Sequence, residues 1–169
     1  MKKAKGFTLV ETLVSLALFS MMMVLVGLVL QRSQEQAALN DAKLILQNNL
    51  REALYKMSQE IRESAPSRVT VAADGSSVTF QVPANISTSG TITWSTPITY
   101  QIGGNGSQLI RADGTGQNTV YANDVQGLTF TSNGAPLKGV VYSVTGQRVL
   151  TNGRIISLTS NGEAELRNP

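Results

Sequence analysis

A long apolar segment near the N-terminus most constrains what this chain can form. The run from Phe7 to Leu30 contains a single charged side chain, Glu11. This run is longer than the roughly 20 residues that a helix needs to cross the hydrocarbon core of a bilayer. Lys2, Lys3 and Lys5 precede it, and basic residues before a span favour the cytoplasmic side. The pattern predicts one membrane-spanning helix with its N-terminus in the cytoplasm.

Glu11 is the unusual residue of this segment. A carboxylate at the centre of a bilayer costs about 2.5–3.5 kcal/mol on insertion scales. Such a group is therefore seldom left without a partner in a membrane. Among the residues of the apolar run, Glu11 is the one that requires a functional explanation.

The residues around Glu11 form a recognisable motif. The sequence KGFTLVE at residues 5–11, with a basic leader before it and an apolar helix after it, resembles the class III signal of type IV prepilins and pseudopilins. In that family a membrane-embedded prepilin peptidase cuts after the glycine and methylates the new N-terminal residue. The resemblance implies cleavage between Gly6 and Phe7, N-methylation of Phe7, and pairing of Glu11 with the N-methylated residue of a neighbouring subunit.

Three alternative assignments fit this segment less well. A secretory signal peptide has an apolar core of about 7–15 residues with a small-residue cleavage site after it, whereas here the run is longer and Gly6 precedes it. A plain single-pass anchor accounts for the length and the lysines but gives no reason for Glu11. A core helix of a soluble domain would carry polar residues within so long a run.

The charge distribution argues against nucleic-acid binding. The net charge is +3, with 14 basic and 11 acidic side chains, and Lys2, Lys3 and Lys5 account for the whole excess. The chain after Gly6 is balanced, and it has no cluster of Lys and Arg with interleaved aromatic residues, the usual footprint of a nucleic-acid surface. The basic charge of the chain is therefore not evidence of nucleic-acid binding, and the sequence does not identify a ligand of the head.

Residue types that carry chemistry are scarce. The chain has no Cys and no His, which excludes nitrogen- and sulfur-ligated metal sites and most nucleophile–base pairs. Asp113-Gly114-Thr115-Gly116 lacks the spacing of an aspartic protease loop. Asp113, Asn123 and Asp124 could supply oxygen ligands to calcium, but no coordination set is fixed. We expect no enzyme, no cofactor and no assigned metal site.

The chain divides into four parts by pattern. They are a leader at 1–6, a transmembrane and filament-core helix at 7–30, an amphipathic helix at 31–65 and a β-rich head at 66–169. Pro66 marks the helix stop, because the residue before a proline disfavours helical backbone. The apolar residues of the second helical part recur every three or four positions, on one face: Leu39, Ala42, Leu46, Leu50, Leu54, Met57 and Ile61. Its charged residues are assigned to the other, solvated side: Arg51, Glu52, Lys56, Glu60 and Glu63.

The head is predicted to be an antiparallel sheet on which the helix packs. Asp74-Gly75-Ser76 is typical of a hairpin turn, and alternation in 78–82 and 98–102 indicates strands with one buried face. Phe80 and Tyr100 are expected to point at the helix. The predicted strands are 68–73, 77–83, 91–94, 98–102, 108–112, 119–122, 125–131, 139–145, 148–150 and 154–159. The fold class is α+β and pilin-like.

The functional hypothesis is a structural subunit that assembles through its N-terminal helix. The resemblance implies other pilin or pseudopilin subunits, prepilin peptidase and an inner-membrane assembly platform as partners. It also implies a bacterial inner-membrane location before assembly into a periplasmic or extracellular filament. Major pilins usually carry a proline within the apolar half and often a C-terminal disulfide loop, and this chain has neither.

The missing proline favours a minor pilin or a pseudopilin, and the late part of the chain has a loose similarity to the J-type pseudopilins of type II secretion. The sequence does not separate a type IV pilus from a secretion or competence filament. The alternative is a single-pass membrane-anchored binding module that never polymerises. That alternative predicts an uncleaved leader and a replaceable Glu11.

Overall fold

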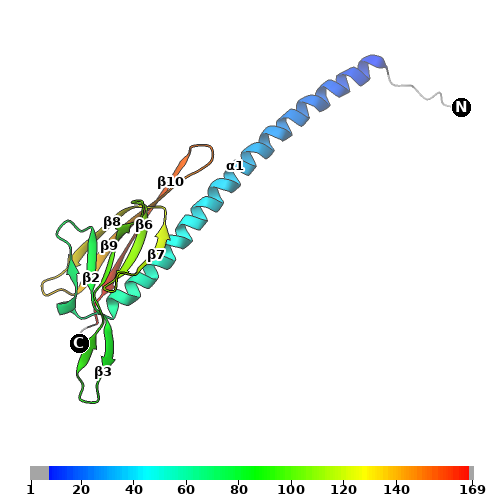
Figure 1. Ribbon diagram of the computed structural model, residues 1–169. Coiled ribbons are helices and arrows are strands. Elements are labelled where there is room, and N and C mark those ends of the chain that lie inside the picture. Colours follow the sequence, from blue (N-terminus) through cyan, green and yellow to red (C-terminus); the bar gives the residue numbers. More distant parts are fainter. Residues whose placement is uncertain (1–7, 168–169) are drawn as a thin grey trace. The chain divides into compact units, whose positions relative to one another are not determined.

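The computed structural model describes residues 8–167, and within them one long helix precedes ten strands. The helix α1 runs over Leu9–Arg62. The chain forms two units, Met1–Asp41 and Ala42–Pro169. The first described unit contains only the early part of α1, and the second contains the rest of α1 with all the strands (Figure 1). An α+β class with antiparallel sheets, as predicted, is confirmed.

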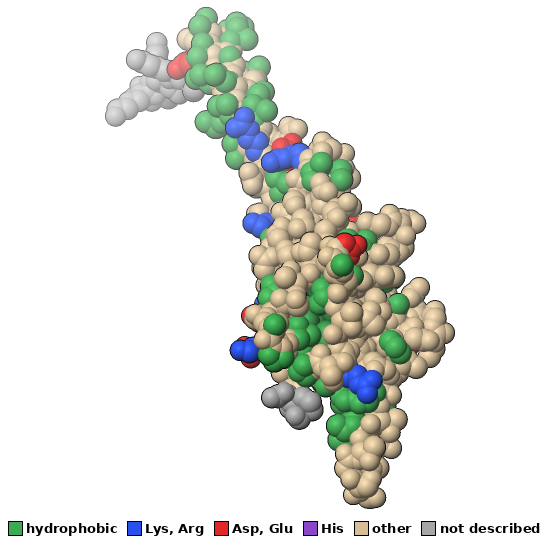
Figure 2. Space-filling view, turned by 90° about the vertical axis from the view of Figure 1, so that its left-hand side faces the viewer, with side chains coloured by type: hydrophobic (Ala, Val, Ile, Leu, Met, Phe, Trp, Pro, Cys, Tyr) green, Lys and Arg blue, Asp and Glu red, His purple; other side chains and the backbone are tan. Residues whose placement is uncertain are grey.

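In the unit Met1–Asp41, the helix has no buried side chain among its described residues. Apolar side chains from Leu9 to Leu30 are at least about half exposed; Figure 2 shows them gathered along this part of α1. No proline interrupts α1, so nothing in the sequence breaks its backbone hydrogen bonds. Gly27 has no atom near its missing Cβ.

In the unit Ala42–Pro169, one face of α1 is buried in the core. The predicted residues Ala42, Leu46, Leu50, Leu54, Met57 and Ile61 are all buried there, together with Ala53 and Ser58. The helix ends at Arg62, and Pro66–Arg68 forms a short 3-10 helix, η1. Buried Ser64 donates its hydroxyl to the carbonyl of Gln81 at 2.7 Å, which fixes the chain where it leaves the helix.

The largest sheet has five strands in the order β1-β2-β5-β6-β7, all antiparallel. Their bounds are β1 Thr70–Val71, β2 Ser77–Phe80, β5 Ile98–Gly103, β6 Gln108–Asp113 and β7 Asn118–Asn123. As predicted, Phe80 and Tyr100 point into the core, where their rings stack with centroids 5.9 Å apart. Thr79 and Thr99 lie on the other face and share a hydrogen bond.

A second sheet has the order β10-β9-β8, with β8 at Val125–Asn133, β9 at Gly139–Val149 and β10 at Ile155–Glu165. The inner face of this sheet packs into the same core as Phe80, through the side chains of Val125, Phe130, Val140 and Val144. The two sheets and the buried face of α1 therefore share one hydrophobic cluster.

A third, two-stranded sheet is the hairpin of β3 Pro83–Ile86 and β4 Ile92–Trp94. It extends away from the other two sheets in Figure 1. Every residue of β3 is exposed. At its base, the guanidinium of Arg68 lies 5.4 Å from the ring centroid of Trp94, a cation–π geometry.

Several strand predictions are wrong in detail. Predicted strand 68–73 is reduced to β1, and predicted strand 77–83 ends at Phe80. Pro83, predicted to end that strand, instead begins β3, an exposed edge strand in which it need not donate a ladder hydrogen bond. Predicted strands 139–145 and 148–150 are one strand, β9, since Gly146 and Gln147 stay in register with β10. The last strand continues to Glu165 instead of ending at 159, because β9 offers it partners along its whole length.

Candidate functional site

Glu11 lies in the first turn of α1, where it takes part in a capping box with Thr8. The amide of Glu11 donates to Oγ1 of Thr8 at 3.3 Å, and the amide of Thr8 donates to Oε2 of Glu11 at 3.5 Å. Such reciprocal bonds satisfy amides at a helix start that have no partner within the helix. Within residues 8–167, Glu11 has no cationic partner. The spacing Thr8-Leu9-Val10-Glu11 is that of a capping box, a signal in the sequence that the interpretation of Glu11 did not use.

Gly6 and Phe7, the predicted cleavage and N-methylation positions, lie outside the described residues. The described helix begins two residues after Phe7. The predictions of cleavage after Gly6 and of methylation at Phe7 therefore remain predictions.

The hydroxyls of the apolar part of α1 are satisfied within the helix. Thr12 donates to the carbonyl of Leu9 at 2.8 Å, Ser15 to that of Glu11 at 2.8 Å, and Ser20 to that of Leu16 at 2.7 Å. Polar groups without a partner are costly in hydrocarbon. Of the described helices, α1 is long and apolar enough to cross a membrane, and these internal bonds suit it to that surrounding.

The candidate calcium ligands do not come together. Asp113 ends β6, while Asn123 ends β7 and pairs with Gln108 at the other end of the β6–β7 pair. Oδ1 of Asp113 instead accepts hydrogen bonds from the hydroxyl and amide of Thr115 and from the amide of Gln117. These bonds, with that of the Thr115 hydroxyl foremost, lower the pKa of Asp113. Within residues 8–167, no three acidic side chains are grouped as metal ligands.

Glu60, which was assigned to the solvated side of the helix, is instead bound to the sheet. Its Oε2 accepts from Nε of Arg111 at 2.8 Å and from the hydroxyl of Tyr100 at 3.1 Å. Its Oε1 accepts from the hydroxyl of Tyr121 at 3.1 Å. Burial of the phenol and then the charge of Glu60 raise the pKa of Tyr100. The prediction for Glu60 was wrong, because three partners on β5, β6 and β7 surround its carboxylate.

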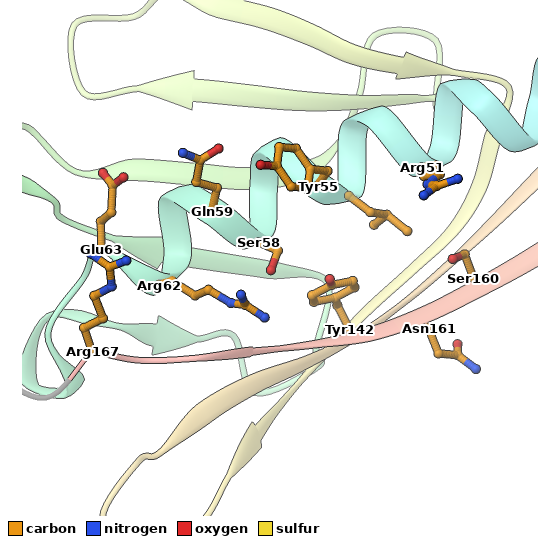
Figure 3. A pocket seen from close by; sticks show the side chains of 11 residues that line it. Arg51, Tyr55, Ser58, Gln59, Arg62, Glu63, Tyr142, Ser160, Asn161 and Arg167 are labelled. Atoms are coloured by element: carbon orange, nitrogen blue, oxygen red, sulfur yellow. The ribbon is translucent and has the colours of Figure 1, made fainter.

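A cleft of about 450 Å³ lies between α1 and the strands β9 and β10. Figure 3 shows the helix along one wall, with Ser58 and Arg62 projecting toward Tyr142, and with Ser160 and Asn161 on the opposite wall. Three arginines line this cleft, Arg51, Arg62 and Arg167, against one acidic residue, Glu63. None of the three is in an ion pair within the described part of the chain.

Sequence reasoning did not identify this cleft. The spacing of Arg51, Tyr55 and Arg62 places them on one helical face. That spacing could have predicted the helical wall of the cleft. Arg167 comes from the far end of the chain, so its place beside Arg62 depends on the tertiary fold.

One family model matches the N-terminal part of the chain. Residues 1–27 match the model described as the prokaryotic N-terminal methylation motif. A search of curated proteins found no match to this chain. The matched residues include Gly6, Phe7 and Glu11, and the motif indicates a type IV pilin-like or pseudopilin precursor. Such a signal implies processing by prepilin peptidase and assembly with other pilin subunits.

Proposed function

We propose that this protein is a structural subunit of a type IV pilus or type II secretion filament, of the minor pilin or pseudopilin kind. The observation that carries the proposal is a carboxylate, Glu11, at the start of an exposed apolar helix whose first part lies within a methylation motif. An α+β head with an N-terminal helix supports it. The absence of proline in α1 favours a minor pilin or pseudopilin over a major pilin.

The proposal assigns each part of the chain a task. Residues 1–6 are a leader removed after Gly6, and Phe7 becomes the N-methylated first residue. Residues 7–30 span the inner membrane and later form the filament core. The amphipathic part 31–65, helical as far as Arg62, connects it to the head at 66–169. The apolar side chains between Leu9 and Leu30 have no partners within the described chain, so lipid or neighbouring helices must cover them in a membrane or filament.

Glu11 then stabilises assembly by pairing with the N-terminal ammonium of a neighbouring subunit. In an apolar setting an ion pair is stronger than the roughly 0–1 kcal/mol of an exposed pair. Leaving one buried charge without its partner costs about 3–5 kcal/mol. The assembly ATPase and the membrane platform supply the work, and this chain is the part that they move.

The first test is the intact mass of the membrane-extracted protein, expressed with and without a prepilin peptidase. We expect loss of residues 1–6 and gain of one methyl group only when the peptidase is present. An unprocessed chain in both cases would reject the pilin proposal. It would leave the membrane-anchored module that does not polymerise.

The capping box makes a sharper second test possible. A capping box accepts either Glu or Gln at this position, whereas an ion pair needs the carboxylate. Glu11→Gln therefore keeps the helix cap and removes the pairing charge. We expect this variant to be processed normally but not to enter filaments when it is co-expressed with its assembly system. Normal incorporation of Glu11→Gln would show that capping is the whole role of Glu11, and Thr8→Ser serves as the cap-preserving control.

A further inference from the structure

The outer edge of β10 is an unpaired strand edge beside the arginine-lined cleft. β10 is the end strand of the β10-β9-β8 sheet, and no other described strand pairs with it. Natural proteins protect such edges with proline, charged side chains, bulges or a covering helix or loop. The strand Ile155–Glu165 contains no proline and no bulge, and its two charged residues, Glu163 and Glu165, lie in its last part.

The hydrogen bonds at the two ends of β10 show which of its backbone groups are free. The amide of Leu150 donates to the carbonyl of Arg154, and the amide of Leu166 donates to the carbonyl of Lys138. In an antiparallel ladder, hydrogen-bonded pairs alternate with pairs that are not bonded to each other. The even-numbered residues of β10, from 156 to 164, therefore bond to β9. The backbone groups of the odd-numbered residues, Thr159 and Asn161 among them, point away from it.

The chain just beyond β10 also contacts the helix. The amide of Arg167, two residues after β10, donates to the carbonyl of Arg62 at the end of α1, at 3.1 Å. This bond closes one end of the cleft, along which α1 and β10 both run. Toward the other end a second hollow is lined by Gln47, Leu50 and Arg51 of the helix and by Leu158 and Thr159 of β10.

The charges along the cleft indicate what it accepts. Arg51 lies near the middle, and Arg62 and Arg167 lie at the closed end, all with exposed side chains. Glu63 is the acidic residue of the lining, and Glu163 and Glu165 occupy the last part of β10. Guanidinium groups bind carboxylates with strong, charge-assisted hydrogen bonds. The volume of about 450 Å³ falls within the range of roughly 300–1,000 Å³ of ligand sites.

We propose that the cleft between α1 and β10 binds an extended acidic segment of another polypeptide. The segment adds as a strand to the free edge of β10 around Thr159 and Asn161, and its carboxylates meet Arg51, Arg62 and Arg167. In this mode main-chain hydrogen bonds supply affinity and side-chain contacts supply selectivity. The proposal goes beyond assembly through the N-terminal helix and does not depend on it.

The test uses the full chain in detergent micelles and a short fluorescent peptide in which glutamate and valine alternate. Binding is measured by fluorescence anisotropy. Two further peptides carry lysine in place of glutamate, or a proline at the centre with the charge unchanged. We expect no binding of the lysine peptide and about tenfold weaker binding of the proline peptide, as for one or two lost hydrogen bonds. Equal binding of either peptide overturns the proposal, because it removes the charge requirement or the strand requirement.

Variants locate the binding surface. Arg51→Gln should weaken binding of the acidic peptide about tenfold. Arg154→Gln makes an equal charge change in the turn between β9 and β10 and should leave the binding unchanged. Asn161→Pro removes an outward amide that β9 does not use, and Asn161→Ala is its control. Equal effects of the two arginine variants overturn the site, as does tighter binding of a single-stranded oligonucleotide of the same charge. If Asn161→Pro unfolds the protein, the comparison of Arg51→Gln with Arg154→Gln and the binding of the proline peptide still test the proposal.

Discussion

Glu60 on α1 accepts a hydrogen bond from Nε of Arg111 on β6 at 2.8 Å, and this ion pair joins the helix to the five-stranded sheet. Both side chains are about three-quarters covered, with 27% and 23% of their surfaces exposed. Two tyrosine hydroxyls complete the shell of the carboxylate. The helix is thus oriented on the sheet by a polar cluster in addition to its apolar face.

Replacing the carboxylate of Glu60 should destabilise the head. Glu60→Gln removes the charge that Arg111 and two hydroxyls contact, and we expect a loss of about 1–2 kcal/mol, since the site is partly exposed. Denaturant unfolding measures it. Glu63→Gln is the control, because Glu63 is exposed and has no side-chain hydrogen bond within residues 8–167. Equal stability of the two variants would contradict the orienting role of Glu60.

Alkaline pH should destabilise the head through Tyr100. Burial of the phenol, reinforced by the charge of Glu60, raises its pKa in the folded state. The stabilisation linked to the neutral phenol is complete below the unfolded pKa of about 10, and it is lost as the pH rises above that value. Unfolding free energies measured from about pH 8 to about pH 11 should fall at the alkaline end. Tyr100→Phe should be less stable near neutral pH and should show a shallower alkaline decline, and an identical decline would exclude Tyr100 as the titrating group.

A side chain at Gly146 should push the helix from the sheet. A Cβ there would lie 2.9 Å from Cδ1 of both Leu46 and Leu50, and each of these leucines is only 1% exposed. Gly146→Val should cost about 1–3 kcal/mol through overpacking. A double variant with Leu46→Ala should recover part of that loss. Gly127→Val is the matched control, because the atom nearest to a Cβ at that position, on Thr145, would be 3.4 Å away. An equally large cost there would point to a general effect of valine in the strands.

Removing the hydroxyl of Ser64 should loosen the exit from α1. Its bond to the carbonyl of Gln81 is 2.7 Å long and lies in a site where Ser64 is 1% exposed. Ser64→Ala should lower the free energy of unfolding by about 1–2 kcal/mol. Ser67→Ala, an exposed serine in η1, should change it little. Thermal unfolding of both variants is the measurement. Equal midpoints for Ser64→Ala and Ser67→Ala would show that the bond from Ser64 to Gln81 does not stabilise the fold.

Periodicity predicted the helix and its buried face well, because spacing of three or four residues determines which side chains share a face. Leu46, Leu50 and Met57 were identified from spacing alone and are buried. The strand β3 was missed, since residues 84–86 show no clear alternation in the sequence and only pairing with β4 defines the strand. The strand preference of a short segment depends on the partner strand, which the local sequence does not show.

Contacts between distant residues account for the remaining errors. Gly146 was expected to interrupt a strand, but the helix approaches closely there and leaves room for no side chain. Glu60 was placed in solvent because the helical spacing does not say where Arg111, 51 positions later, will lie. Arg62 and Arg167 come together in the cleft for the same reason. Glu11 was singled out from the sequence, whereas its capping box with Thr8 came from the structure.

The first buried side chain of α1 is that of Ala42. In the proposed assembly, moving the segment Leu9–Leu30 from lipid into contact with other helices would therefore break no contact of the folded core. The segment would partition between lipid and neighbouring helices as between two solvents. The chain should accordingly show two separate equilibria. Bilayer thickness and lipid composition should shift the partition of the helix, while the unfolding midpoint of the head stays the same.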